Sequence, residues 1–443
     1  MTGHLLPPQG ARRVPARLLA TLLFALAAAV LASCGGGGGG SGSAAPVTAT
    51  AAAECPSVEV TPIRIDTQGA APILSKDDYV DATLRVGNSG EAIRTRIRGR
   101  GNSTWIMPKK PYRLKLDKKT ALLGMAADKD WALLANHSDK TLMRNSVAFC
   151  MSRILGMAWT PDSRYVELTL NGDYVGSYQL TEHVKTGADR VDIGEESTLA
   201  GDPGMGFLLE IDARLDEVFW FNSTQGVPYT VKSDLVAEQL PAITDYVAQV
   251  EAALFGPDFT NADTGYEHYL GTDSLIDMYL INELMRNTDA FASSTFAYRP
   301  RGGKLHFGPA WDFDIAAGNV NYSGNWETEG WWVRTVSPYV ARLQQDPEFE
   351  RRVKQRWAYL ASRLPELHGY ISATARALDG SQKRNFERWP ILDSYVWPNA
   401  VVTGSYADEV KYLADWLQKR AAWMDTQLPP RDADTAAGTQ RRH

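Results

Sequence analysis

Two runs of alternating polar and apolar residues, 165–170 and 173–180, flank the dipeptide Asn171-Gly172. Asn-Gly is a preferred sequence for a two-residue hairpin turn, because both central positions of that turn require positive φ. Alternation with a period of two is typical of strands that bury one face. This segment therefore predicts an antiparallel β-hairpin, and it is the clearest local structural signal in the chain.

Similar signals predict further strands and several helices. Strands are predicted over residues 58–66, 81–87, 93–99, 111–117, 207–212, 229–233, 294–299 and 304–308. Helices are predicted from Ser138 or Asp139 to Gly156, over 272–287 with one apolar face, and over most of 338–428. We therefore expect one α+β folded unit between Cys55 and about Leu428, with mainly antiparallel strands first and mainly helices last.

The N-terminus has the features of an export signal. Arginines precede an apolar run, 18–31, that is too short to cross a membrane comfortably. The run ends in Leu-Ala-Ser before Cys34, which resembles a bacterial lipobox. We therefore predict a signal peptide at 1–33 and a diacylated Cys34 that anchors an exported lipoprotein to a membrane, facing the periplasm or the cell surface. The Gly- and Ala-rich segment 34–54 predicts a flexible tether, and 429–443 predicts a polar tail.

Composition narrows the classes of partner. The formal net charge of −6 leaves no basic surplus, so we expect no nucleic-acid partner. Two cysteines, Cys55 and Cys150, remain after Cys34. An exported protein can form a disulfide between them. Two buried free thiols are the alternative, because the sequence does not place their Cα atoms.

Two carboxylates lie on either side of a predicted hairpin, Asp289 before it and Asp312 after it. A hairpin brings its ends together, so the gap of 23 residues (312 minus 289) becomes a short distance in space. Carboxylates brought together repel each other unless a cation or a shared proton compensates. We therefore expect a divalent-metal site, which Asp314 joins if this stretch is extended. The alternative is that Asp289 caps a turn and Asp312 faces solvent.

A glycine-containing turn and the strand after it supply groups that suit a phosphate. Backbone N–H groups beside glycines can approach a phosphate closely, and cationic side chains flank the turn. The candidate residues are Arg98, Gly99, Arg100, Gly101, Asn102 and Lys115. The alternative is an ordinary hairpin turn beside solvated arginines.

The order of these features resembles that of protein kinases, in which a glycine loop and a strand lysine precede two acidic segments. Several longer motifs are similar to the CotH family, the spore-coat type of atypical secreted kinase. They are "GRGNSTW", "KKPYRLKLDKK", "LLANHSDKTLMRN", "YVELTLNGDYVGSYQLTEHV", "FLLEID", "YLINELMRNTDAF" and "GPAWDFD". The resemblance covers about residues 58–330, in order.

This resemblance implies a two-lobed, kinase-like domain over 55–428, with an N-lobe at about 58–186 and a C-lobe at about 187–428. It also implies ATP with Mg²⁺ or Mn²⁺ as cofactors, and phosphorylation of serine or threonine in a protein substrate. The acids matching the family's essential pair are Asp289 and Asp312.

The kinase layout suggests a role for each candidate. Asp289 would be the base, Lys115 would bind phosphate, and Glu182 would lie beside the adenine. Asp312 and Asp314 would hold the metal. Ordinary kinases have a metal-binding asparagine where this chain has Ser294, so Asn287 is the additional candidate ligand. The predicted helix before Gly156 also lacks the glutamate that pairs with the kinase lysine, and Arg144 is its prominent polar residue.

Two other functions fit the sequence. One is a different metal-dependent phosphoryl enzyme at the same site, such as a pseudokinase that transfers AMP. The other is a non-catalytic surface-binding lipoprotein, in which the segment "NWETEGWW", 325–332, forms an aromatic platform for a glycan.

Overall fold

A computed structural model of the protein describes residues 55–88 and 90–429. These residues belong to a single compact unit. The predicted signal peptide, the predicted lipidation site Cys34, the whole tether and the polar tail after Pro429 lie outside the described residues. Of the helices that are described, none is long and apolar enough to cross a membrane.

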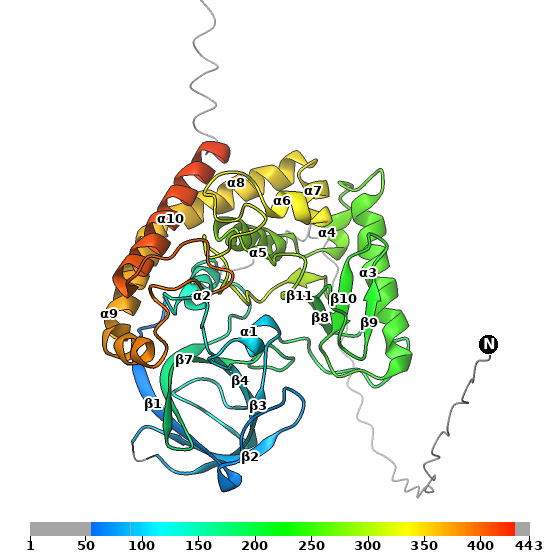
Figure 1. The fold of residues 1–443 in the computed structure, drawn as a ribbon. Coiled ribbons are helices and arrows are strands. Elements are labelled where there is room, and N and C mark those ends of the chain that lie inside the picture. The colour runs from blue at the N-terminus through cyan, green and yellow to red at the C-terminus, as the bar shows by residue number, and fades with distance from the viewer. Residues whose placement is uncertain (1–54, 89, 430–443) are drawn as a thin grey trace, which may run out of the picture. The chain divides into compact units, whose positions relative to one another are not determined.

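The first seven strands form a closed barrel (Figure 1). Neighbouring strands pair antiparallel, except for the first and sixth, which pair in parallel and close the barrel. Alternate side chains fill its interior, among them Leu114, Trp131 and Leu168. The strands are β1 (Val60–Thr67), β2 (Val80–Val86), β3 (Ile93–Gly99), β4 (Tyr112–Thr120), β5 (Asp128–Leu134), β6 (Ser163–Leu170) and β7 (Asp173–Glu182).

A second, five-stranded sheet lies in the later part of the chain, in the order β12-β11-β8-β10-β9. Its strands are β8 (Phe207–Ile211), β9 (Trp220–Asn222), β10 (Pro228–Val231), β11 (Thr295–Arg299) and β12 (His306–Phe307). The helices are α1 (Ser103–Ile106), α2 (Arg144–Ile154), α3 (Leu240–Phe255), α4 (Tyr266–Tyr269), α5 (Thr272–Leu284), α6 (Val333–Val336), α7 (Pro338–Leu343), α8 (Pro347–Ser362), α9 (Leu364–Arg388) and α10 (Tyr406–Gln427).

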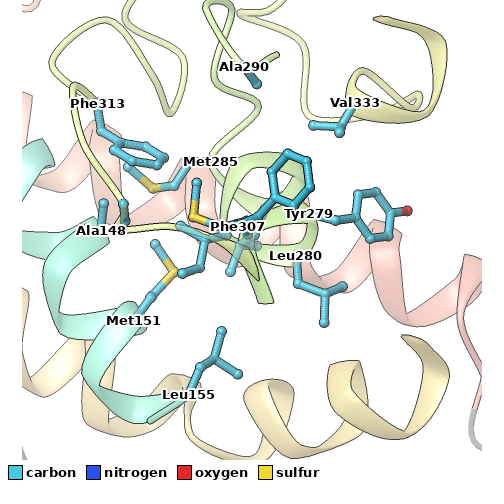
Figure 2. Packing of buried hydrophobic residues seen from close by; sticks show 14 of the residues in the cluster. Ala148, Met151, Leu155, Tyr279, Leu280, Met285, Ala290, Phe307, Phe313 and Val333 are labelled. Atoms are coloured by element: carbon cyan, nitrogen blue, oxygen red, sulfur yellow. The ribbon is translucent and has the colours of Figure 1, made fainter. Parts of the chain in front are cut away.

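One large core joins α2, the second sheet and the C-terminal helices. Figure 2 shows Met151 of α2 and Leu155, the residue directly after α2, in the same cluster as Leu280 of α5 and Phe307 of β12. Because α2 follows the barrel strand β5 in sequence but packs in this core, it links the barrel to the rest of the molecule.

The predicted hairpin is confirmed, with Asn171 and Gly172 at φ of 51° and 88°. The predicted start of the next helix upstream is wrong. α2 begins at Arg144 rather than at Ser138 or Asp139, because the Asp139 carboxylate accepts the backbone N–H groups of Thr141 and Arg144 and holds the chain in a turn. The helix predicted over 272–287 exists as α5, but it is buried on nearly every side rather than along one face.

The α+β class is confirmed. A closed barrel and a second sheet replace the simpler division into antiparallel strands followed by helices, because β1 pairs with a strand about 100 residues later. The disulfide left open by the sequence is present: Cys55 is bonded to Cys150 of α2, with Cα atoms 5.0 Å apart.

Candidate functional site

A cavity of about 570 Å³ lies where the glycine turn, α2, the second sheet and the segment after β12 meet. Most of the residues that line it come from the stretches 98–104, 134–138, 210–217, 289–294 and 311–315. Asp289 and Asp312 both line this cavity, together with Asp314. The predicted meeting of the acids is therefore present in the fold.

The bend after β12 that contains Asp312 and Asp314 is called the acidic corner below. It holds both acids toward the cavity because Phe313, which lies between them, is anchored in the core. Phe313 is fully buried in the large hydrophobic cluster (Figure 2). Asp312 adopts a φ of 67°, a backbone conformation that is uncommon for a residue other than glycine. Ser294 donates a hydrogen bond of 2.9 Å to Oδ2 of Asp312. The stretch is therefore bent rather than extended, and both acids still face the cavity.

The acids destabilise one another's charged forms. Burial, with the negative charge of Asp312 as the next cause, raises the pKa of Asp289 to about 6. Burial and then the charge of Asp312 also raise the pKa of Asp314 well above its usual range. Among the described residues, no ion pair involves any of these three carboxylates. A bound cation would relieve both the burial cost and the repulsion.

These acids fit a magnesium or manganese ion that shares its coordination with a phosphate. Within residues 55–88 and 90–429, no group of three or more His, Cys, Asp or Glu side chains is arranged to hold a metal alone. Mg²⁺ is usually bound through one or two carboxylates, with substrate phosphates and water completing the octahedron. Asp312 and Asp314 match that smaller requirement.

Asn287 lies beside these acids and is hydrogen-bonded to both acidic segments. Its amide nitrogen donates to Oδ1 of Asn282 and to the backbone carbonyl of Asp312, and its oxygen accepts the N–H of Asp289. It does not line the cavity. Its side chain ties the two acidic segments together from behind the cavity wall, and its role as a metal ligand stays a prediction.

The glycine turn lies on the cavity as predicted, with Arg98, Gly99, Arg100, Gly101 and Asn102 in its wall. The Arg100 guanidinium lies 5.7 Å from the ring centre of Trp311. Burial lowers the pKa of Arg100, while the charge of Asp312 acts in the opposite direction. A side chain at residue 99 would collide with the Trp105 ring at 2.4 Å, so this position requires glycine.

Lys115 is not brought to the cavity, whereas Arg113 of the same strand lines it. Both side chains lie on the outer face of β4, since Leu114 and Leu116 fill the barrel interior. Two residues along a strand correspond to about 7 Å, which displaces Lys115 from the cavity wall. Arg113 is therefore the cation that β4 places in the cavity wall in place of Lys115, and it also pairs with Asp130 at 3.1 Å.

Glu182 also lies away from the cavity wall. Its carboxylate forms a buried ion pair with Arg190 at 2.7 Å and accepts the backbone N–H of Asp162. Its carboxylate is thus occupied structurally, and the position of the Glu182 region beside the adenine stays a prediction. The next residue, His183, lines the cavity instead, and its buried Nδ1 has no hydrogen-bond partner among the described residues.

Sequence reasoning missed an acidic and basic pair on the second sheet. Glu210 of β8 lines the cavity and pairs with Lys232 at 3.3 Å. Burial raises the pKa of Glu210 to about 7, against the opposing effect of Lys232, and Asp312 adds to the increase. The only signal was that each of two predicted apolar strands, 207–212 and 229–233, contains one of these charged residues, and nothing local shows that the strands are neighbours.

A further missed feature is the support that α2 gives to the acidic corner. Oδ1 of Asn145 accepts the backbone N–H of Phe313 at 2.7 Å. Nε of Arg144 donates to the carbonyl of Ala316 at 3.0 Å, and its guanidinium pairs with Asp139 at 2.6 Å, both side chains being fully buried. Arg144, which the sequence had shown only as the prominent polar residue of a helix without the kinase glutamate, therefore orients the corner.

The segment 325–332 does not line the cavity. Trp326 is 40% exposed, but Trp331 packs against Trp423 with ring centres 4.9 Å apart and against Arg334. Its tryptophans are therefore largely used in packing.

Comparison with known proteins gives one clear match. A family model described as CotH kinase protein matches residues 97–424. A search of curated proteins finds no match.

Proposed function

Because the chain belongs to the CotH kinase family, we propose that it transfers the γ-phosphoryl group of ATP to serine or threonine hydroxyls of a protein substrate. The observation that carries this proposal is that Asp289 and Asp312 face one cavity together with the glycine turn. Such a cavity supplies both anionic groups for a metal and cationic groups for phosphate.

The proposed roles follow from the chemistry of the cavity wall. Asp312 and Asp314 would hold Mg²⁺ or Mn²⁺, which when bound neutralises charge on the phosphates. Arg100 and Arg113 would bind phosphate oxygens, and the backbone of the glycine turn allows close approach. Phosphoryl transfer depends on positioning and charge compensation rather than on a covalent nucleophile.

Asp289 would act as the base. Its pKa of about 6 leaves it mainly ionised at neutral pH yet more basic than an ordinary aspartate. The acceptor hydroxyl oxygen forms a bond to the γ-phosphorus, its proton passes to Asp289, the bond from the γ-phosphorus to the β–γ bridging oxygen breaks, and ADP leaves.

A two-lobed arrangement is also part of the proposal, with the barrel as the N-lobe and the second sheet and helices as the C-lobe. Export is supported by the disulfide between Cys55 and Cys150, since disulfides persist in oxidising compartments. Lipid anchoring through Cys34 completes the proposal of a membrane-attached exported kinase.

The test is incubation of the purified domain with labelled ATP, Mn²⁺ or Mg²⁺, and a casein-like acceptor. We expect labelled acceptor from the wild type and a loss of about 100-fold or more in Asp312→Ala, because a charged group that stabilises the transition state is removed. Asp379→Ala is the matched control, since Asp379 is an exposed residue of α9 outside the cavity.

The mass of the product identifies the reaction. An added phosphate supports the kinase, whereas an added AMP would show nucleotidyl transfer instead. Undiminished transfer by a folded Asp312→Ala protein would refute the proposed site.

A further inference from the structure

One part of the cavity wall is uncharged and incompletely hydrogen-bonded. We call it the His137 patch: His137, Ser138, Tyr322 and Trp397, all of which line the cavity. His137 is only 5% exposed and Ser138 is fully buried. Neither Nδ1 of His137 nor Oγ of Ser138 has a hydrogen-bond partner among the described residues. Buried polar atoms without partners are unfavourable, so both atoms are suited to bind a ligand.

The patch is held in place by its backbone. The carbonyl of Ser138 accepts hydrogen bonds from Asn319 at 3.1 Å and from Asn399 at 2.7 Å. The ring of His137 contacts the edge of Trp389 with ring centres 5.9 Å apart. The unpartnered atoms therefore belong to a rigid segment, and a ligand would not have to order them.

An aromatic pair completes the patch. The rings of Tyr322 and Trp397 stack at 6.3 Å with an angle of 16° between their planes. Trp397 remains 49% exposed, so one part of its ring is open to a second planar group. Stacked aromatic contacts bind planar side chains with modest but specific energy.

The His137 patch lines the same cavity as the acids and contains none of the cations of the cavity wall. Tyr322 lines the same cavity as Asp289 and Asp314, and burial together with their charges raises the pKa of its hydroxyl. The cations Arg100, Arg113 and Lys232 line the cavity with Glu210, on which the charge of Asp312 acts. Lys109 also lines the cavity, but its Nζ donates to Ser177 and Asn385. The phosphates therefore fit the part of the wall that carries Arg100, Arg113 and Lys232, which we call the cationic wall.

From this division we infer that the His137 patch binds the acceptor, as an extended polypeptide segment that places a planar side chain on Trp397. The inference rests on the proposed function. An in-line transfer requires the acceptor hydroxyl opposite the leaving ADP. The main-chain N–H and C=O groups of the segment satisfy His137 and Ser138, and the serine or threonine hydroxyl reaches Asp289.

The test uses synthetic decapeptides with a single serine, in which one phenylalanine replaces alanine at each of the three positions on either side. We expect one placement to lower the acceptor KM of the wild type by about tenfold. In Trp397→Ala this preference should disappear. The KM for ATP is measured in the same assays, because it reports on the cationic wall, which this substitution does not touch. Ser138→Ala should raise the KM for every peptide by about threefold to tenfold, since it contacts the main chain.

Trp220→Ala is the control, because Trp220 is 46% exposed on β9 and does not line the cavity. It should retain the phenylalanine preference. A flat phenylalanine scan in an active wild type, or a preference that survives in Trp397→Ala, would overturn the inference and leave the kinase assignment intact. Failure of the wild type to phosphorylate any peptide or casein would overturn both.

Discussion

At the scale of the residue, His137 is a buried histidine that the fold keeps neutral. Burial lowers its pKa to about 4, and the charges of Lys109 and Lys110 act in the same direction. In the unfolded chain a histidine titrates near pH 6.5. Between about pH 6.5 and 4 the unfolded state therefore binds more protons than the folded state, so protonation favours unfolding.

We predict that His137→Gln reduces the acid sensitivity of the protein. Between pH 7 and 4.5, the free energy of unfolding of the wild type should fall by about 2 kcal/mol more than that of the variant. Urea denaturation at the two pH values measures both. Parallel decreases in wild type and variant would show that the histidine is not held neutral by the fold.

At the scale of the element, α2 determines where the acidic corner lies. Its first residues, Arg144 and Asn145, bond to the backbone of residues 313–317, and its apolar side packs in the large core. The corner therefore depends on a helix more than 150 residues earlier in the chain. Asn145 acts as a positioning residue, because it holds Phe313 rather than a reacting group.

We predict that Asn145→Ala lowers phosphoryl transfer by about tenfold and raises the Mn²⁺ concentration needed for half-maximal activity, because Asp312 and Asp314 lose their orientation. Metal titrations of activity measure both effects. Ser146→Ala is the matched control on α2, since Ser146 bonds to Met143 and Tyr165 rather than to the corner. An equal change of metal dependence in both variants would mean that α2 acts only through stability.

At the scale of the whole molecule, the disulfide joins the beginning of the folded unit to α2. It closes a loop with a sequence separation of 95, and this loop includes five of the seven barrel strands. A crosslink over such a loop restricts the unfolded chain strongly. The covalent bond therefore stabilises the connection between the barrel and the helix that supports the site.

We predict that the double variant Cys55→Ser/Cys150→Ser loses about 4 kcal/mol of the free energy of unfolding. Urea denaturation with and without dithiothreitol measures this loss. The reductant should destabilise the wild type by a similar amount and leave the variant unchanged. If complete reduction leaves the urea denaturation curve of the wild type unchanged, the prediction is contradicted.

Local chemistry alone decides several features of this protein. Turn preference and alternation place the hairpin at Asn171-Gly172, the strand that ends at Gly99, and the return strand before Asp312, because each depends on neighbours in the chain. The closeness of Asp289 and Asp312 follows from one such hairpin.

Only the tertiary structure decides the rest. Strands and helices that are distant in sequence determine barrel closure and the burial of α5. They also determine that Arg113 rather than Lys115 lines the cavity, and that Glu210 pairs with Lys232. The periodicity of a strand shows which side chains share a face, but not which neighbour that face meets, since register and closure are set by packing of the whole chain.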